Sequence, residues 1–233
     1  MKDLSNQNII HIIKDNIQYL QFKKLLEYKD IITHAYPLGL DLNFRADKIN
    51  KETVDINITQ YNDTDGLITN KKNLILSTTN ADCILMLFFD PVTMTIANVH
   101  SGWKGTLQRI SVKTVEKMQK EFNCNAKDII CCICPSIRQC HFEVDKDVKE
   151  MFEKEFKDLK ICENIEMMKK QKNKEKWNID TVLINKMILE KQGLIKENII
   201  DSGICSVCNS DLIHSYRVEQ KGYGLSTALI SLK

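Results

Sequence analysis

The chain has 233 residues, of which 43% are hydrophobic and 27% charged, an ordinary composition for a globular protein with a buried core. Its 33 basic and 31 acidic side chains leave a formal charge of +2, which is too little to argue for a nucleic-acid partner, and the sequence has no basic stripe with interleaved aromatics. No apolar run reaches the roughly 18–20 residues that span a bilayer, and no signal-peptide pattern is evident. We therefore expect a cytoplasmic protein with no membrane or nucleic-acid partner.

Hydrophobic patterning predicts the elements in chain order. The first 25 or so residues fit strand or helix equally well. Further on, the patterning predicts strands and helices as follows: strands over 73–79, 83–89 and 94–100, a helix over 107–122, a strand over 128–134, helices over 145–156 and 181–191, and a strand over 224–232. The run 83–89 is apolar throughout, which is typical of a strand buried on both faces.

Strands and helices are mixed without strict βαβ order, which predicts an α+β fold of layered mixed β-sheets flanked by helices. With 8 Gly, 3 Pro and no low-complexity linker, we expect one domain over residues 1–233.

Cys83 and His100 are the candidate chemical centre. Cys83 begins the apolar strand, and His100 ends the next one, so adjacent strands would bring the two side chains toward each other. Thiolate and imidazole are preferred zinc ligands, and the same pair suits a nucleophile and its base. The alternative is that Cys83 belongs to the core and His100 only caps a loop.

The residues around this pair suggest further roles. Gly102 and Gly105 flank Trp103 and Lys104, so the backbone there could adopt positive φ and approach a ligand closely. Trp103 offers a stacking surface for a planar base, or a core side chain. Lys104 offers a charge for an anion, or an ordinary exposed lysine. Asp82 could orient His100 or accept a proton from substrate, or it could cap a turn.

These residues form motifs that resemble the YfiH-like family, once called the multicopper polyphenol oxidase or laccase domain and now described as purine nucleoside phosphorylases. The resemblance runs from about residue 33 to residue 233. It rests on the following segments: Asn80-Ala81-Asp82-Cys83, Asp90-Pro91, Val99-His100-Ser101-Gly102-Trp103-Lys104-Gly105-Thr106, Leu42-Asn43-Phe44-Arg45, Asp65-Gly66-Leu67-Ile68-Thr69, Cys134-Pro135-Ser136-Ile137 with Cys140-His141-Phe142-Glu143-Val144, Asp180, and Ser215-Tyr216-Arg217.

The resemblance implies a metal site of two His and one Cys in a pocket between sheets. Cys83 and His100 match two of these ligands. The metal would be zinc, with copper as the alternative, and phosphate would be the co-substrate. The implied activities are phosphorolysis of adenosine, inosine, guanosine and methylthioadenosine, and deamination of adenosine. Arg45 resembles a family position near the pocket and could hold phosphate, while Trp103 and Lys104 would contact the substrate.

The sequence departs from the family at the third ligand. The family's other histidine lies in a motif that this chain lacks, because no histidine occurs between Asn43 and Asp65. Two ligands hold zinc far more weakly than three, so a catalytically impaired family member is one alternative. Substitutes could come from His34, His141 or His214, and His141 would then line the pocket.

Other functions remain open on the sequence alone. Two CxxC pairs, at Cys131/Cys134 and Cys205/Cys208, would suit a structural Cys₄ zinc site, although strand alternation would point the first two cysteines to opposite faces. Cys83 could instead serve an amidase acting on a peptidoglycan precursor. A nucleoside-binding or partner-binding remnant without catalysis is a further alternative. Five histidines are too few for a full multicopper oxidase.

Overall fold

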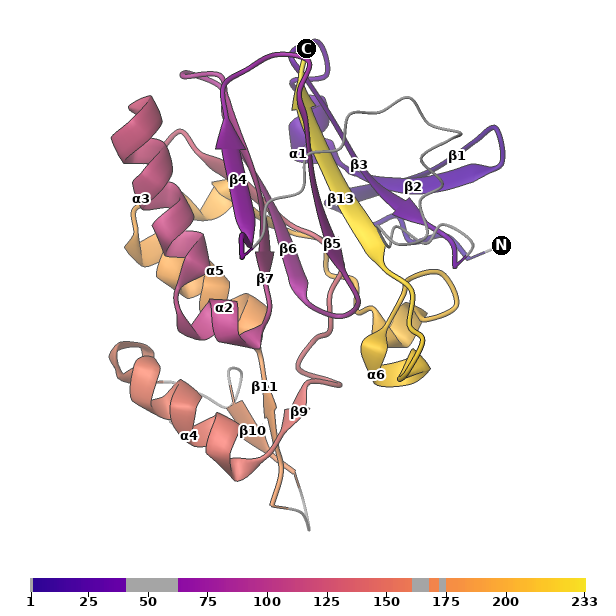
Figure 1. The fold of residues 1–233 in the computed structure, drawn as a ribbon, viewed down its shortest axis with the longest axis vertical. Helices are drawn as coiled ribbons and strands as arrows, with labels where there is room; N and C mark the ends of the chain where they lie inside the picture. The colour runs from indigo at the N-terminus through magenta and orange to yellow at the C-terminus, as the bar shows by residue number, and fades with distance from the viewer. Residues whose placement is uncertain (1, 41–62, 161–167, 172–174) are drawn as a thin grey trace.

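A computed structural model describes residues 2–40, 63–160, 168–171 and 175–233. Two five-stranded sheets stack face to face, with helices outside one of them and a small third sheet at one end (Figure 1). The architecture is the expected α+β arrangement of layered sheets. No helix in these ranges is long and apolar enough to cross a membrane.

The first large sheet has the strand order β1-β2-β3-β13-β5. Its strands are β1 (Ile9–Lys14), β2 (Ile17–Phe22), β3 (Ile32–Leu38), β5 (Ile75–Asn80) and β13 (Ser226–Leu232). The ambiguous N-terminal segment thus forms an antiparallel hairpin, because Ile9 pairs with Phe22 and Lys14 with Ile17. Asp15 and Asn16 both have positive φ, the conformation that a two-residue hairpin turn of this type requires.

The second large sheet has the order β12-β8-β6-β7-β4. Its strands are β4 (Gly66–Thr69), β6 (Ile84–Asp90), β7 (Thr95–Ser101), β8 (Ile130–Ile133) and β12 (Ile199–Asp201). The turn between β6 and β7 is fixed by Asp90, whose Oδ1 accepts the backbone N–H groups of Val92 and Thr93 at 2.8 and 3.2 Å. This side-chain-to-backbone turn ends the apolar run and reverses the chain.

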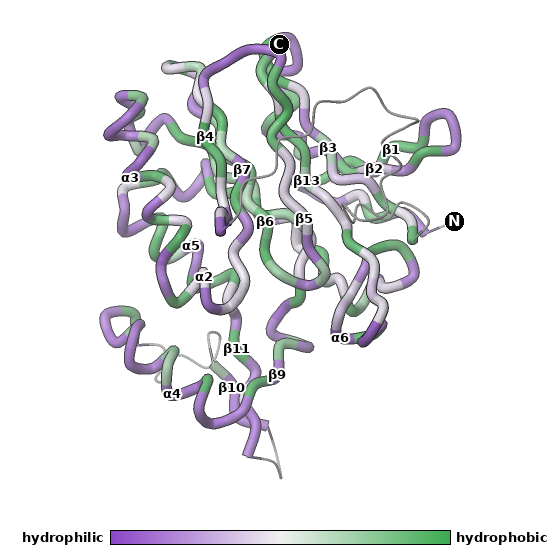
Figure 2. Tube along the Cα trace, viewed as in Figure 1, coloured by the Kyte–Doolittle hydropathy of each residue, from purple (hydrophilic) through white to green (hydrophobic). Residues whose placement is uncertain are grey.

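Strand β6 is buried on both faces, as its unbroken apolar run predicts. Leu85, Leu87 and Phe89 belong to the core between the two large sheets. Met86 and Phe88 belong to a second core, between this sheet and helices α3 and α5. Figure 2 shows the apolar residues along β6, while α4 is mostly polar.

The helices are α1 (Lys23–Leu26), α2 (Trp103–Leu107), α3 (Ile110–Phe122), α4 (Lys146–Glu155), α5 (Thr181–Lys191) and α6 (Tyr216–Glu219), with 3₁₀ turns η1 (Lys157–Leu159), η2 (Lys196–Asn198) and η3 (Val207–Asn209). The third sheet, of order β10-β11-β9, contains β9 (Glu143–Val144), β10 (Met168–Lys170) and β11 (Trp177–Ile179). It packs with α4 and α5 around a third core that includes Phe152 and Ile184.

Two local predictions need correction. Neither Gly102 nor Gly105 has the expected positive φ, and the segment is helical over α2. The predicted helix over 107–122 is divided, because Arg109 has a φ of +55°. Gly102 has a φ of −64° and caps α2. It therefore serves the site by lacking a side chain, and not by adopting a left-handed backbone conformation. By contrast, Gly193 follows α5 with a φ of +106°, as expected for a helix-terminating glycine.

Candidate functional site

Strand pairing places Cys83 and His100 on the same face of the second sheet. Leu85 is the partner of His100, and Ile84 is the partner of Ser101. Since side chains alternate along a strand, Cys83 shares the face of Leu85 and is a diagonal neighbour of His100. Gly102 makes room for both, because a Cβ at this glycine would lie 3.4 Å from the Cys83 sulfur and 3.9 Å from His100 Nε2.

Asp65 fixes the orientation of the His100 ring. His100 Nδ1 lies 2.9 Å from Asp65 Oδ1, and the His100 backbone N–H donates to the Asp65 carbonyl at 2.7 Å. The contact arises because β4, which begins at Gly66, pairs with β7. A carboxylate that holds Nδ1 makes Nε2 the nitrogen available for chemistry. The role expected of Asp82 toward His100 is thus filled by Asp65.

Asp82 forms hydrogen bonds that hold the chain around the site in place. Its Oδ1 accepts from the Ser206 hydroxyl at 2.6 Å, and its Oδ2 accepts from the Arg217 backbone N–H at 2.7 Å. The residue has a φ of +82°, a strained conformation that persists only where the surroundings enforce it. Asp82 thereby joins the bend that carries Cys83 to the C-terminal segment. It also lines the pocket, so a direct part in catalysis stays a prediction.

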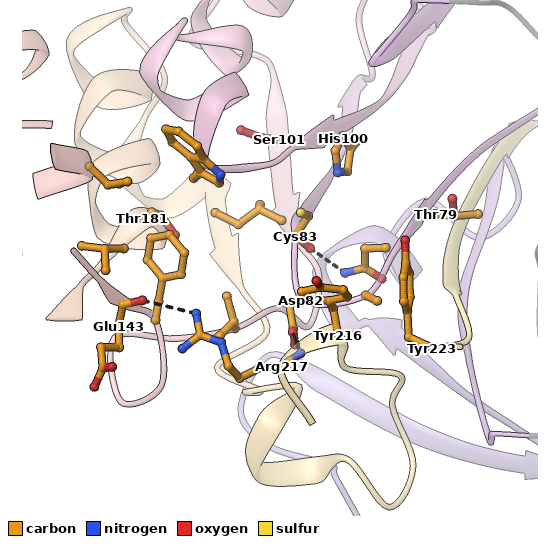
Figure 3. Close-up of a pocket in the computed structure, with 18 of the residues that line it drawn as sticks. Thr79, Asp82, Cys83, His100, Ser101, Glu143, Thr181, Tyr216, Arg217 and Tyr223 are labelled. Carbon is orange, nitrogen blue, oxygen red and sulfur yellow. Dashed lines mark hydrogen bonds between the residues drawn. The ribbon is translucent and has the colours of Figure 1, made fainter. Parts of the chain in front are cut away.

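A cavity of about 540 Å³ opens beside the pair. Figure 3 shows His100 above Cys83, with Tyr216, Arg217 and Glu143 on the facing wall. The wall residues are Thr79, Asn80, Ala81, Asp82, Cys83, Ile84, His100, Ser101, Trp103, Ile137, Phe142, Glu143, Val144, Asp145, Val148, Thr181, Tyr216, Arg217, Tyr223 and Leu225. This volume and mixed lining suit a small organic ligand.

Charge and burial set the state of Cys83. Burial, followed by the negative charges of Asp82 and Asp65, raises the pKa of its thiol to about 11. Activated cysteine nucleophiles occupy electropositive surroundings that lower the pKa. The thiol is therefore neutral near pH 7 in this environment, which disfavours the cysteine-amidase alternative.

The other predicted substrate residues differ in their placement. Trp103 lines the pocket and also packs against the third core, while its contact with the substrate stays a prediction. Lys104 is exposed and its Nζ lies 5.5 Å from the Trp103 ring centroid, but it is absent from the pocket wall. Arg45 lies outside the described residues.

No second histidine reaches the pocket within the described part of the chain, which contains all five histidines. The buried His34 accepts the Phe22 N–H at Nε2, and burial lowers its pKa to about 4. His214 pairs with Glu219. His141, expected to line the pocket, has its Nδ1 beside the Cys140 sulfur at 3.1 Å. Catalytic zinc takes three protein ligands, so the described residues at this pocket do not complete such a site.

The predicted Cys₄ site is wrong, because its two CxxC pairs do not come together. Cys131 belongs to the core beneath the helices and Cys134 to the core between the sheets, so alternation separates them as expected. Cys205 and Cys208 lie instead with Cys140 and His141.

Comparisons with known proteins agree with this picture. The family model described as multi-copper polyphenol oxidoreductase laccase matches residues 42–233. The chain belongs to this family. Purine nucleoside phosphorylase YlmD of Bacillus subtilis is 31% identical over 170 residues, covering 73% of this chain and 59% of that protein. Adenosine deaminase RL5, from an unknown prokaryotic organism, is 28% identical over 186 residues, covering 79% of this chain and 67% of that protein.

Solved structures share the fold. The crystal structure of Bacillus licheniformis hypothetical protein YfiH superposes with a TM-score of 0.75 at 22% identity, covering 92% of this chain and 96% of that one. YlmD from Geobacillus stearothermophilus gives 0.64 at 24% identity, covering 72% and 61%. The likeness in fold extends over nearly the whole chain, whereas the chain spans about 59% of the length of the Bacillus subtilis relative.

Local sequence patterning does not single out Asp65 or several residues of the pocket wall. Asp65 lies in one of the family segments, yet nothing in its spacing indicates a bond to His100, 35 positions away. Tyr216 and Arg217 also belonged to a recognised motif, and both line the pocket. Phe142 lies in the family segment that contains His141, and it lines the pocket as well. The family motifs were the available signal in each case.

Proposed function

We propose that the pocket binds purine nucleosides and cleaves them by phosphorolysis, with deamination of adenosine as a second activity. The observation that supports this most is the oriented His100–Asp65 pair, which lies beside Cys83 at a cavity whose wall includes aromatic side chains and Arg217. The names of two relatives, a purine nucleoside phosphorylase and an adenosine deaminase, also support it.

The walls offer one surface for each part of such a substrate. Trp103, Phe142 and Tyr216 line the pocket, and aromatic faces of this kind stack on a purine base. Arg217 donates Nη1 to the His141 carbonyl and Nη2 to the Glu143 carbonyl, at 3.0 and 3.3 Å. Both acceptors are neutral, so the charge of the guanidinium remains available to phosphate.

Phosphorolysis then needs one proton transfer from the protein. A phosphate oxygen forms a bond to C1′ of the ribose as the bond from C1′ to N9 of the purine breaks, which yields ribose 1-phosphate and the free base. His100 in its protonated form would give its Nε2 proton to the departing purine, and phosphate or solvent would return one. Asp65 stabilises the imidazolium that this step requires.

Zinc, or copper as the alternative, is implied by the family. At this pocket the metal would have only Cys83 and His100 as ligands from the described residues, fewer than a catalytic zinc site uses. When bound, such a metal supplies Lewis-acid polarisation or an activated water. A metal bound at His100 Nε2 would occupy the nitrogen that gives up the proton, so the proton transfer proposed here belongs to the metal-free pocket.

The deciding experiment incubates the purified chain with adenosine, with and without phosphate, and follows the products by chromatography. Phosphate-dependent release of adenine supports the proposal. Inosine as the main product would assign deamination as the principal activity. The absence of both adenine and inosine would contradict the proposal. Inosine, guanosine and methylthioadenosine extend the assay to the substrate range.

Two variants connect the signal to the site. Cys83→Ala removes the thiol beside His100, and loss of the signal in this variant would tie the activity to the pocket. Cys124→Ser is the matched control, because Cys124 lies outside the pocket beside Thr93.

A further inference from the structure

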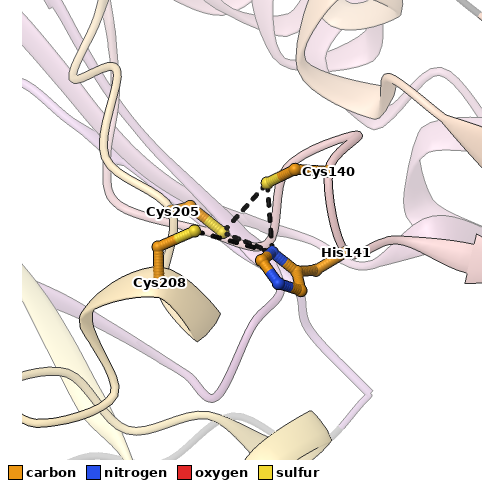
Figure 4. A group of neighbouring side chains, drawn as sticks. All are labelled: Cys140, His141, Cys205 and Cys208. Atoms are coloured by element: carbon orange, nitrogen blue, oxygen red, sulfur yellow. Dashed lines mark hydrogen bonds between the residues drawn. The ribbon is translucent and has the colours of Figure 1, made fainter.

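We propose that Cys140, His141, Cys205 and Cys208 bind one structural zinc ion, at a site separate from the Cys83–His100 pocket. Within the described residues, the donor atoms of these four side chains all lie within 4.8 Å of one another (Figure 4). Three thiolates and one imidazole are a donor set typical of structural zinc. This inference does not depend on the proposed nucleoside activity.

The distances match a zinc tetrahedron. Bonds of about 2.3 Å to sulfur and about 2.0–2.1 Å to nitrogen give edges of about 3.8 Å between sulfurs and about 3.5 Å between nitrogen and sulfur. Cys140 and Cys205 sulfurs are 3.6 Å apart. His141 Nδ1 lies 3.7 Å from the Cys205 sulfur, 3.6 Å from the Cys208 sulfur and 3.1 Å from the Cys140 sulfur. A single ion fits between these atoms with small adjustments.

The scaffold holds the two ligand-bearing segments together independently of any metal. Cys140 and His141 follow strand β8, whereas Cys205 and Cys208 follow β12, its parallel neighbour. Ser136 forms a bridge with Cys205. Nearby, Arg138 donates Nη1 and Nη2 to the Asp201 carboxylate at 2.9 and 2.5 Å. The four ligands are thus brought together by the fold and not by chance contacts of long surface loops.

Backbone N–H groups of Cys208 and Arg138 hydrogen-bond to the Cys205 sulfur. Amide donors to a ligating sulfur orient and stabilise the ligand once a metal is bound.

We expect the bound ion to hold one wall of the pocket in place. The His141 carbonyl accepts from Arg217, and both Phe142 and Arg217 line the cavity. A fully ligated ion leaves no position for substrate, so its contribution would be to stability and to the placement of this wall.

The test is metal analysis of the purified chain by mass spectrometry. The double variant Cys83→Ala/His100→Ala removes the pocket ligands and should retain about one zinc per chain. Cys208→Ser and His141→Ala should each lose it, whereas the control Cys124→Ser should not. His141→Cys, which restores a fourth ligand, should keep zinc and shows that loss in His141→Ala is not general misfolding.

Two further readouts identify the ligands and the effect. Cobalt substituted for zinc should give thiolate-to-metal charge transfer in wild type but not in Cys208→Ser. Chelation should lower the thermal midpoint of wild type by about 5–10 °C and leave that of Cys208→Ser unchanged. Undiminished zinc in both Cys208→Ser and His141→Ala would overturn the proposal. So would a disulfide among these cysteines in metal-free protein as isolated, or iron or copper in place of zinc.

Discussion

The Cys83–His100 pocket and the Cys140/His141/Cys205/Cys208 cluster both contain cysteine and histidine, but they are built for different purposes. The pocket has two such donors at one end of an open cavity of about 540 Å³, whose wall includes aromatic side chains and Arg217. The cluster has four donors around a single point. A catalytic metal needs an open position and a structural one needs a closed shell.

The contrast shows that donor type alone does not locate chemistry. The family signature draws attention to Cys83 and His100, where the described residues supply an incomplete ligand set. The complete set joins Cys140 and His141, which lie in one of the quoted family segments, to Cys205 and Cys208, which lie in none, and the two parts meet through the β8–β12 pairing. Variants at each site test whether the two are as distinct as their geometry implies.

The largest effect is expected from His100→Ala. If His100 is the acid of the pocket, its loss should lower kcat/KM for the nucleoside by about 10²–10⁴-fold, with the metal content of the cluster unchanged. Steady-state kinetics and metal analysis on the same preparation measure both. His11→Gln, on strand β1 of the other sheet, is the control. A variant that lost cluster zinc together with activity would show that the two sites are not separate.

The reactivity of Cys83 gives the next largest contrast. Because its pKa is raised to about 11 by burial and by Asp82 and Asp65, its thiolate fraction at pH 8 is about 100-fold below that of an ordinary thiol. Its alkylation by iodoacetamide should therefore be slow in metal-free protein and rise about tenfold per pH unit toward pH 11. Peptide mass spectrometry against time measures this, with denatured protein as the reference. Rapid modification at pH 8 would restore Cys83 as a candidate nucleophile.

Asp65→Asn should lower kcat by about 10–100-fold with a smaller change in KM, because the amide no longer stabilises a charged His100 ring. The pH profile of kcat should shift as well, a change that a purely structural residue would not cause. Asp63→Asn is a close control, since Asp63 is exposed and Asn tolerates its φ of +52°. Equal losses in the two variants would argue against a specific role for Asp65.

The smallest effect is expected from Lys104→Ala. Lys104 is exposed and lies outside the pocket wall, so kcat and KM should both stay within about twofold of wild type. Arg217→Gln offers the comparison, because it removes the cation that does line the wall. A large rise in the phosphate KM for Lys104→Ala alone would return Lys104 to the substrate-binding residues.

Much of this arrangement follows from the sequence, and the exceptions have physical reasons. The apolar run of β6 and its short turn to β7 are enough to predict that Cys83 and His100 are neighbours. Asp65 and the cluster depend on pairings between distant strands, and no local periodicity encodes such pairings. Within β8, by contrast, the pleat alone separates Cys131 from Cys134, so the sequence is enough to argue against this CxxC pair as zinc ligands. The sequence does not show which residues join Cys205 and Cys208.

The strand order of the first sheet has a consequence for how the chain assembles. Strand β13 follows every other described strand in chain order, yet it lies between β3 and β5. During synthesis, the N-terminal hairpin and β3 therefore cannot be joined to β5 until Ser226–Leu232 has been made. The pocket wall at Thr79 and Asn80, at the end of β5, is then completed by a strand inserted last. We expect nascent chains that end before β13 to present two unpaired sheet edges, the kind of surface that chaperones recognise and that promotes aggregation.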